Sequence, residues 1–176
     1  MNRIYKSDIH VHSKYSNKPT IWALKKINCP ESYTSPEFIY KSAKKMGMDY
    51  VTITDHNTIQ GALEIAHLPG VFISTEVTAY FPENGCKIHI VILDINEEVF
   101  KDVMNLRTNV YNLVAYLQKN NIAHFIAHPL YDNAKLSVET VEKILLLFDV
   151  FEVKNGSRSR QFNRLITNIL HSLTRE

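Results

Sequence analysis

The feature of this sequence that most constrains its fold is the alternation of strand-like and helix-like segments. Short runs typical of strands occupy residues 4–12, 50–56, 71–77, 87–93, 122–129 and 150–156. Helical patterns separate most of these runs, at residues 35–47, 58–67, 96–120, from 137 onward and at 159–173. Such alternation predicts α/β architecture.

Local signals add detail to this prediction. Ser35 is a good N-cap for a helix that has Pro36 at its first position and ends near Gly47. No helical pattern fits between residues 71–77 and 87–93, and Asn84-Gly85 is typical of a tight hairpin turn. We therefore expect these two strands to be antiparallel.

Composition is that of an ordinary globular domain. A chain of 176 residues has the length of one domain, and such a domain can bury about 68–70% of its unfolded surface. With 45% hydrophobic residues, 22% charged residues and a net charge of +2, no dedicated nucleic-acid or membrane surface is expected. The N-terminus has no signal-peptide pattern, and Cys29 and Cys86 have neither disulfide nor zinc-ribbon spacing, so we expect a cytoplasmic protein.

The stretch "DIHVHS" carries the strongest chemical signal. Strand side chains alternate between two faces, so Asp8, His10 and His12 point to one side, while Ile9 and Val11 point to the other. Histidines or carboxylates also stand at or near the ends of the other strands: Asp55, His56, Glu76, His89 and His128. Strand ends on one rim meet in space, so this pattern predicts a shared metal site.

These residues resemble those of the PHP (polymerase and histidinol phosphatase) family of metal-dependent phosphoesterases. The resemblance rests on "DIHVHS" at 8–13, "TDH" at 54–56, Glu76, His89 and "AHP" at 127–129. It implies that His10, His12 and Glu76 hold one metal ion. It also implies a second ion held by Glu76, His89 and His128, and a third ion at His56.

The resemblance extends to catalysis and cofactors. It implies catalytic roles for Glu76, His128 and Asp55, at a centre of two to three divalent ions. Histidine-rich ligation with one carboxylate suits Zn, Mn or Fe better than Mg or Ca. We expect ions bridged by Glu76 to lower the pKa of a shared water, so that a metal-bridging hydroxide hydrolyses a phosphoester.

Two departures from the PHP pattern shape the fold prediction. The PHP barrel is closed by a seventh strand with a D-x-H motif, and no such motif follows Val153. We therefore expect a distorted (β/α)7 TIM-like barrel that lacks its last strand, in a single domain over 1–176 that is incomplete at its C-terminus. Self-association or a further domain would cover the open edge. Asn17 stands where the family often has an acidic residue or a histidine.

Supporting residues can also be predicted. Metal-bound histidines usually donate their second N–H to a carboxylate or carbonyl, so Asp8 and Asp55 are expected to orient imidazole rings, and Asn17 is expected to lie beside the third metal. Contacts to an anionic substrate are predicted for Arg158, Lys14 and Asn155. His124 is interpreted as structural, although His124 or Glu152 would be the first candidates to replace missing ligands.

The predicted function is hydrolysis of a phosphorylated small molecule or nucleotide, with no membrane partner. The first alternative is a non-catalytic structural or regulatory PHP module of a larger protein, which the missing strand favours. An amidohydrolase is a less favoured alternative. That class also begins with H-x-H on a barrel strand, but it usually needs a lysine or histidine on a middle strand and a late aspartate.

Overall fold

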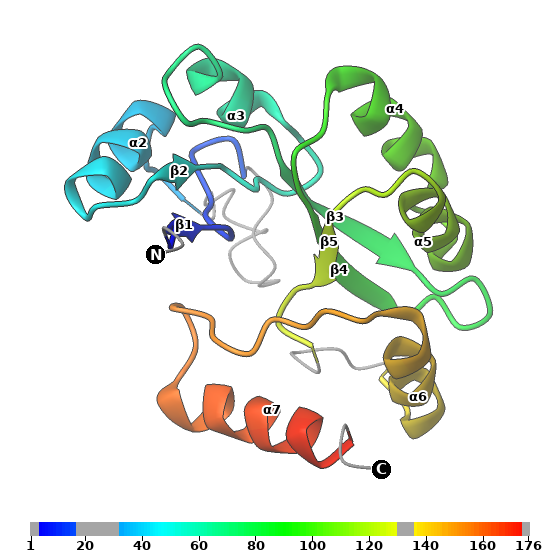
Figure 1. Cartoon of the computed structure of the whole chain (residues 1–176). Coiled ribbons are helices and arrows are strands. Elements are labelled where there is room, and N and C mark those ends of the chain that lie inside the picture. The colour runs from blue at the N-terminus through cyan, green and yellow to red at the C-terminus, as the bar shows by residue number, and fades with distance from the viewer. Residues whose placement is uncertain (1–3, 17–31, 130–135, 174–176) are drawn as a thin grey trace.

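The computed structural model of the chain describes residues 4–16, 32–129 and 136–173, and it has mixed α/β architecture (Figure 1). The strands are β1 (Ser7–Asp8), β2 (Tyr50–Val51), β3 (Thr75–Tyr80), β4 (Lys87–Ile92) and β5 (His124–Ile126). The helices are α2 (Pro36–Lys45), α3 (Gln60–Ile65), α4 (Glu97–Leu106), α5 (Val110–Lys119), α6 (Val138–Leu147) and α7 (Arg160–Leu173). The α/β prediction is confirmed.

The strands follow one another around an arc. β1 pairs in parallel with β2, while β3, β4 and β5 form an antiparallel sheet in that order. Isolated parallel bridges extend the arc between Val51 and Val71, His56 and Glu76, and Ile126 and Phe151. Over the described residues, strand pairing does not close this arc into a barrel. The predicted seven-stranded barrel form is therefore not observed there.

Several predicted strands are regular over only part of their length. Within residues 4–12, regular strand pairing is limited to β1. After β1, the side-chain hydroxyl of Thr54 takes the place of a backbone group in the hydrogen-bond ladder. Val11 N donates to Oγ1 of Thr54 at 3.0 Å, while Thr54 N donates to the carbonyl of Val11 at 2.8 Å. Residues 150–156 contribute a bridge at Phe151 rather than a full strand.

The single helix predicted over residues 96–120 is wrong, because the chain forms α4 and α5 with a break between them. Backbone groups at the break have partners outside the helices, since Tyr80 N donates to the carbonyl of Arg107 at 3.1 Å. Asn109 then caps α5, its side chain accepting from the backbone N of Tyr111 and Asn112. A side-chain oxygen at this position starts a new helix more readily than it continues one.

The predicted N-caps Ser35 and Ser137 and the hairpin are confirmed, while the helix predicted over residues 58–67 is the shorter α3. Ser35 caps α2 by accepting from Phe38 N, and Ser137 caps α6 by accepting from Thr140 N. β3 and β4 are antiparallel, with Thr75 opposite Ile92. Among the described helices, none is both long and apolar enough to span a membrane.

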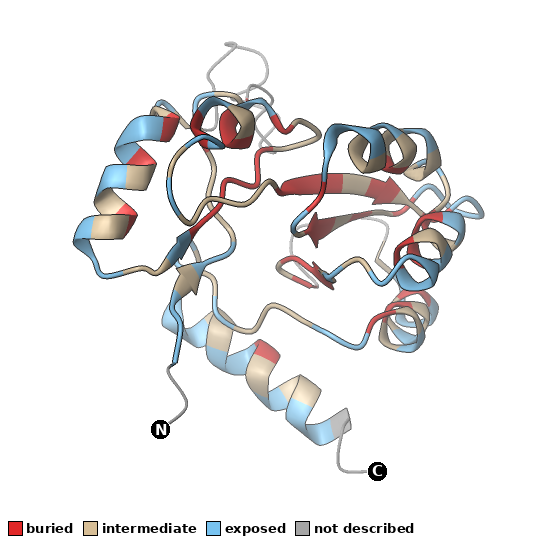
Figure 2. Cartoon of the chain, turned by 45° about the horizontal axis from the view of Figure 1, so that its top comes forward, coloured by how far each residue is buried: buried red, intermediate tan, exposed pale blue. Residues whose placement is uncertain are grey.

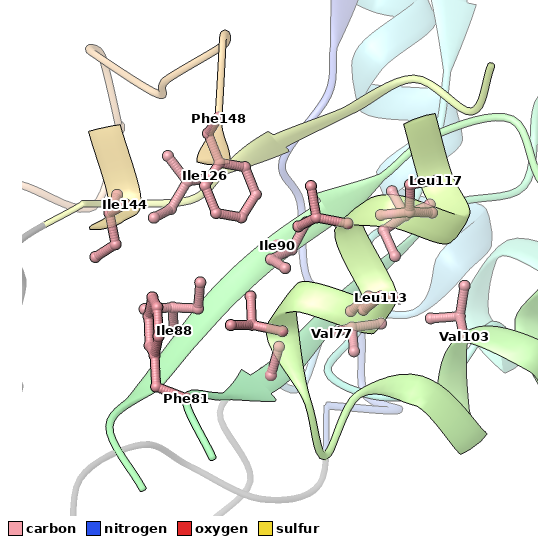
Figure 3. Close-up of a cluster of buried hydrophobic side chains, with 14 of the residues drawn as sticks. Val77, Phe81, Ile88, Ile90, Val103, Leu113, Leu117, Ile126, Ile144 and Phe148 are labelled. Carbon is pink, nitrogen blue, oxygen red and sulfur yellow. The ribbon is translucent and has the colours of Figure 1, made fainter. Parts of the chain in front are cut away.

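The largest core lies between the β3–β4–β5 sheet and helices α4, α5 and α6 (Figures 2 and 3). β4 contributes to it with alternate residues, Ile88, Ile90 and Ile92, which leaves the intervening residues for the opposite face. A second cluster, which includes Ile39 and Ile53, packs α2 and α3 against the residues around β2. The sheet is therefore apolar on its helix-covered face, and His89 of β4 lies on the other face.

Truncation of the core should be costly. Ile90 is completely buried, so Ile90→Ala is expected to lower the free energy of unfolding by about 2–5 kcal/mol. Leu146→Ala is the matched control, because that side chain is 87% exposed and its loss should change stability by less than about 0.5 kcal/mol. Urea denaturation followed by circular dichroism measures both, and equal effects would contradict this assignment of the core.

Glu83, in the turn between β3 and β4, forms an ion pair with a lysine of α6 and a hydrogen bond with a tyrosine of α5. Oε1 of Glu83 accepts from Lys143 Nζ and from the hydroxyl of Tyr111, each at 2.7 Å. The hydrogen bond from Lys143, followed by that from Tyr111, lowers the pKa of Glu83 to about 2.

A depressed carboxyl pKa stabilises the fold above the unfolded pKa of 4.5, and this stabilisation is lost as pH falls towards about 2. We expect Glu83→Gln to be less stable than the native chain at pH 7, with the difference shrinking between pH 4.5 and 2. The effect should be small and weaken in high salt, because the pair is solvent-exposed. Urea denaturation across this pH range checks it, and a difference that grows on acidification would refute it.

Candidate metal centre

Glu76 of β3 directs one carboxylate oxygen at three imidazole rings. Its Oε2 lies 3.3 Å from Nε2 of His10, 3.1 Å from Nε2 of His12 and 3.1 Å from Nδ1 of His56. His10 and His12 follow β1, and His56 pairs with Glu76 through an isolated parallel bridge. Neighbouring strand ends thus bring these side chains together.

The other carboxylate oxygen faces two more rings. Oε1 of Glu76 lies 3.0 Å from Nδ1 of His89 and 3.0 Å from Nε2 of His128. Sheet register explains this approach, because Glu76 is opposite Val91 and His89 lies two residues earlier on the same face of β4. Ala127 N donates to the carbonyl of His89 at 2.9 Å, which brings the following residue, His128, to the same place.

Burial makes this carboxylate unusual. Glu76 is completely buried, and within the described part of the chain its Oε2 has no hydrogen-bond partner. Burial alone would raise the pKa of Glu76, but the close approach of four imidazoles, those of His10, His12, His128 and His89, outweighs burial and holds the pKa well below the usual value. An ionised carboxylate in this position requires positive charge beside it.

The residues present fit divalent metal ions. Ligand atoms lie within 4.8 Å of one another in two groups, His10 with His12 and Glu76, and His56 with Glu76 and His89. Imidazole nitrogens with one carboxylate are typical ligands of Zn and related ions. We call Glu76 and its five histidines, His10, His12, His56, His89 and His128, the Glu76 centre.

A hydroxyl fixes the proton on the ring of His12. Oγ of Ser16 lies 3.0 Å from Oδ1 of Asp55, 2.9 Å from Nδ1 of His12 and 3.1 Å from the backbone N of His56. The serine has one proton and the carboxylate only accepts, so Ser16 donates to Asp55 and accepts from both histidines. In the neutral ring of His12 the proton is therefore on Nδ1, and Nε2 offers a lone pair towards Glu76.

The two aspartates predicted to orient imidazoles lie in different settings. Asp55 is buried and accepts from Ser13 N and Ser13 Oγ, each at 2.6 Å, and it reaches His12 only through Ser16. Gly61 leaves room for this carboxylate, because a Cβ there would overlap Oδ2 of Asp55. Asp8 is exposed and accepts from the backbone N of His10 at 3.4 Å, so its carboxylate contacts the backbone rather than the ring.

Glu152 contacts the centre, although the sequence suggested it only as a replacement ligand. Its Oε1 lies 2.8 Å from Nδ1 of His10. Burial lowers the pKa of His10, but the hydrogen bonds to Glu152 and Glu76 outweigh burial and raise the pKa to about 10. The acidic residue in the last strand-like segment was the available signal for Glu152, and the serines beside H-x-H were the signal for Ser13 and Ser16.

A cavity of about 680 Å³ opens on the centre. All five histidines of the Glu76 centre line it, together with Phe151, Glu152 and the polar residues Lys87, Lys154, Asn155 and Arg158. The predicted substrate contacts Arg158 and Asn155 thus lie at this cavity. Its size is that of pockets for small organic ligands.

Other predicted residues lie elsewhere. Lys14 does not line the cavity, and its Nζ lies 3.5 Å from Oε2 of Glu64 and above the ring of Tyr15. Nδ1–H of His124 donates to the carbonyl of Ile122 at 2.7 Å, and His124 is not one of the five rings around Glu76. Asn17 lies outside the described residues.

No family model matches the sequence. An uncharacterised protein of Methanocaldococcus jannaschii is 40% identical over 96 residues, which are 54% of this chain and 54% of that protein. The chain thus aligns with about half the length of this relative.

Two solved structures share the fold. One is a candidate metal-dependent phosphoesterase from Bifidobacterium adolescentis, with a TM-score of 0.61 and 15% identity over 97% of this chain and 84% of the other. The second is an amidohydrolase from Chromobacterium violaceum with bound sulfate and no metal, with a TM-score of 0.57 and 15% identity over 92% of this chain and 81% of the other. At this identity the likeness is one of fold.

The serine relay can be tested by metal binding. Ser16→Ala removes the acceptor for Nδ1–H of His12, so the affinity for Zn²⁺ should fall about 10–100-fold. Ser172→Ala is the control, because that hydroxyl lies in α7, outside the Glu76 centre, and donates to the carbonyl of Asn168 in its own helix. Competition with a chromogenic chelator measures the affinity, and thermal unfolding checks the fold. Equal affinities in the two variants would show that the relay has no part in metal binding.

Proposed function

We propose that the protein is a metal-dependent phosphoesterase whose ions are held by the Glu76 centre. The observation that carries this proposal is the buried Oε2 of Glu76, which faces three imidazole nitrogens without a hydrogen bond of its own. A metal ion between these atoms would balance the carboxylate and use the nitrogens as ligands. Zn, Mn and Fe are the ions that best suit this ligand set.

The two carboxylate oxygens of Glu76 support a centre with more than one ion. His10 and His12 face Oε2, while His89 and His128 face Oε1, so Glu76 would be shared between two ions. Bound ions would lower the pKa of a water molecule and neutralise charge that develops on the reacting group. His56 is near Oε2 and would serve either ion or a third one.

The cavity wall favours an anionic substrate. Lys87, Lys154 and Arg158 line it beside the Glu76 centre. A guanidinium binds phosphate through two parallel hydrogen bonds, and ammonium groups add positive charge. The substrate we propose is therefore a phosphorylated small molecule or a nucleotide, because the cavity is larger than a phosphate group requires.

Amide hydrolysis is the second candidate, since one structure of the same fold is an amidohydrolase. Both reactions use a metal to activate water, so the metal ligands alone do not distinguish them. Basic residues at the cavity favour the phosphoester, whose charge they would balance.

Glu76→Gln tests the function directly. Turnover of p-nitrophenyl phosphate with added Mn²⁺ or Zn²⁺ should fall at least about 100-fold, because the amide removes the charge that ions share. Glu142→Gln is the matched control, an exposed carboxylate on α6 that should retain full activity. A chelator should abolish turnover and added metal should restore it. Metal-dependent cleavage of p-nitroacetanilide without phosphatase activity would favour the amidohydrolase.

Substrate recognition gives a separate prediction. Arg158→Ala should lower kcat/KM for the phosphoester about 10–100-fold, the equivalent of a charged hydrogen bond worth about 1.5–3 kcal/mol. Its affinity for Zn²⁺ should remain that of the native chain, because Arg158 lines the cavity without belonging to the Glu76 centre. Steady-state kinetics and chelator competition measure these quantities. Unchanged kcat/KM would remove Arg158 from the substrate site.

A further inference from the structure

We propose that Glu152 is a positioning residue that holds two histidines of the Glu76 centre in the geometry needed for metal binding. This inference rests on the proposed function, since it assumes that the centre binds metal. It assigns to Glu152 the orienting role that the sequence suggested for Asp8, whose carboxylate accepts from the backbone N of His10 rather than from its ring.

The backbone of Glu152 is fixed against β5. Ile126 N donates to the carbonyl of Val150 at 3.2 Å, and Glu152 N donates to the carbonyl of Ile126 at 3.0 Å. Figure 1 shows the segment between α6 and α7 that carries these residues. The side chain of Glu152 is 8% exposed, so its carboxylate is directed into the protein beside the centre.

Both carboxylate oxygens of Glu152 are occupied by N–H donors. Oε1 accepts from Nδ1–H of His10 at 2.8 Å, and Oε2 accepts from the backbone N–H of His128 at 2.7 Å. Nδ2 of Asn155 lies 3.0 Å from Oε1 and 3.1 Å from Oε2 and donates to the same carboxylate. Glu152 is therefore engaged as a hydrogen-bond acceptor, which distinguishes it from Glu76 and its unpartnered oxygen.

The contact with His10 selects one form of the ring. A carboxylate only accepts, so in the neutral ring the proton is on Nδ1 and the lone pair of Nε2 is directed towards Glu76. Ser16 produces the same arrangement in His12, and the two Nε2 atoms lie 3.3 Å apart. Glu152 and Ser16 thus orient the rings of His10 and His12, respectively, so that both Nε2 atoms are directed towards the same carboxylate oxygen of Glu76.

The contact with His128 fixes a backbone that few residues adopt. The φ angle of His128 is +28°, on the left-handed side where residues other than glycine are strained. Its N–H donates to Glu152, and its ring nitrogen Nε2 faces Oε1 of Glu76. One carboxylate therefore positions a ligand that follows β1 and a ligand that follows β5, and it joins the two ends of the strand arc.

Glu152→Gln provides an isosteric test with Zn²⁺ as the probe. An amide has one acceptor oxygen, so it can satisfy only one of the two N–H donors, and its own N–H₂ group would face the other. We expect Zn²⁺ affinity to fall about 10–100-fold, while Glu142→Gln binds like the native chain. Circular dichroism and thermal unfolding establish that both variants are folded.

Nuclear magnetic resonance of the Zn²⁺-loaded protein separates positioning from general stabilisation. The native chain should give protected ring N–H signals from His10 and His12. Glu152→Gln should lose the His10 signal and keep that of His12, and Ser16→Ala should do the reverse. A fall in affinity with both signals intact would overturn the positioning role.

Native Zn²⁺ affinity in Glu152→Gln would also overturn the inference, provided that Glu76→Gln loses affinity. If Glu76→Gln itself binds Zn²⁺ like the native chain, the proposed metal centre is wrong instead. The two failures are therefore distinguishable in one set of titrations.

Discussion

The buried carboxylate of Glu76 is the constraint on which the rest of the site depends. Removing an ionised group from water costs several kcal/mol unless charges or N–H donors compensate. Within the described part of the chain, the ion pairs of Glu76 are all with histidine, five of them, from separate segments. Because imidazole is neutral or charged according to its surroundings, this arrangement can balance the carboxylate with protons or with a bound cation.

The sheet that carries this carboxylate also holds the fold together. On β4, Ile88, Ile90 and Ile92 pack into the core, while His89 between them faces Glu76. Strand alternation therefore makes the apolar core the rigid support of the candidate site, and the packing behind them fixes the site residues on β3 and β4. α3 also approaches the candidate site closely, because Gly61 has no side chain that would overlap the carboxylate of Asp55.

Much of the fold could be predicted because its signals are local. Ser35 and Ser137 start helices through hydrogen bonds within their own first turns, and Asn84-Gly85 marks the hairpin. The failures have a common cause, which is competition from distant partners. Arg107 ends α4 where its carbonyl meets Tyr80, and Thr54 replaces part of the β1 ladder with its hydroxyl. Apolar periodicity carries no information about such partners.

The same division applies to the candidate site. The sequence by itself determined the types and strand-end positions of its histidines and of Glu76, because these side chains are typical metal ligands that can be recognised one by one, and the period of a strand orients them. Only the tertiary structure decided which group supports each ring. Glu152 reaches His10 across 142 positions of sequence, Asp55 acts on His12 through Ser16, and Lys14 pairs with Glu64 away from the cavity. These pairings depend on how separate elements pack against one another, and local sequence patterns do not encode contacts between residues that are far apart in the chain.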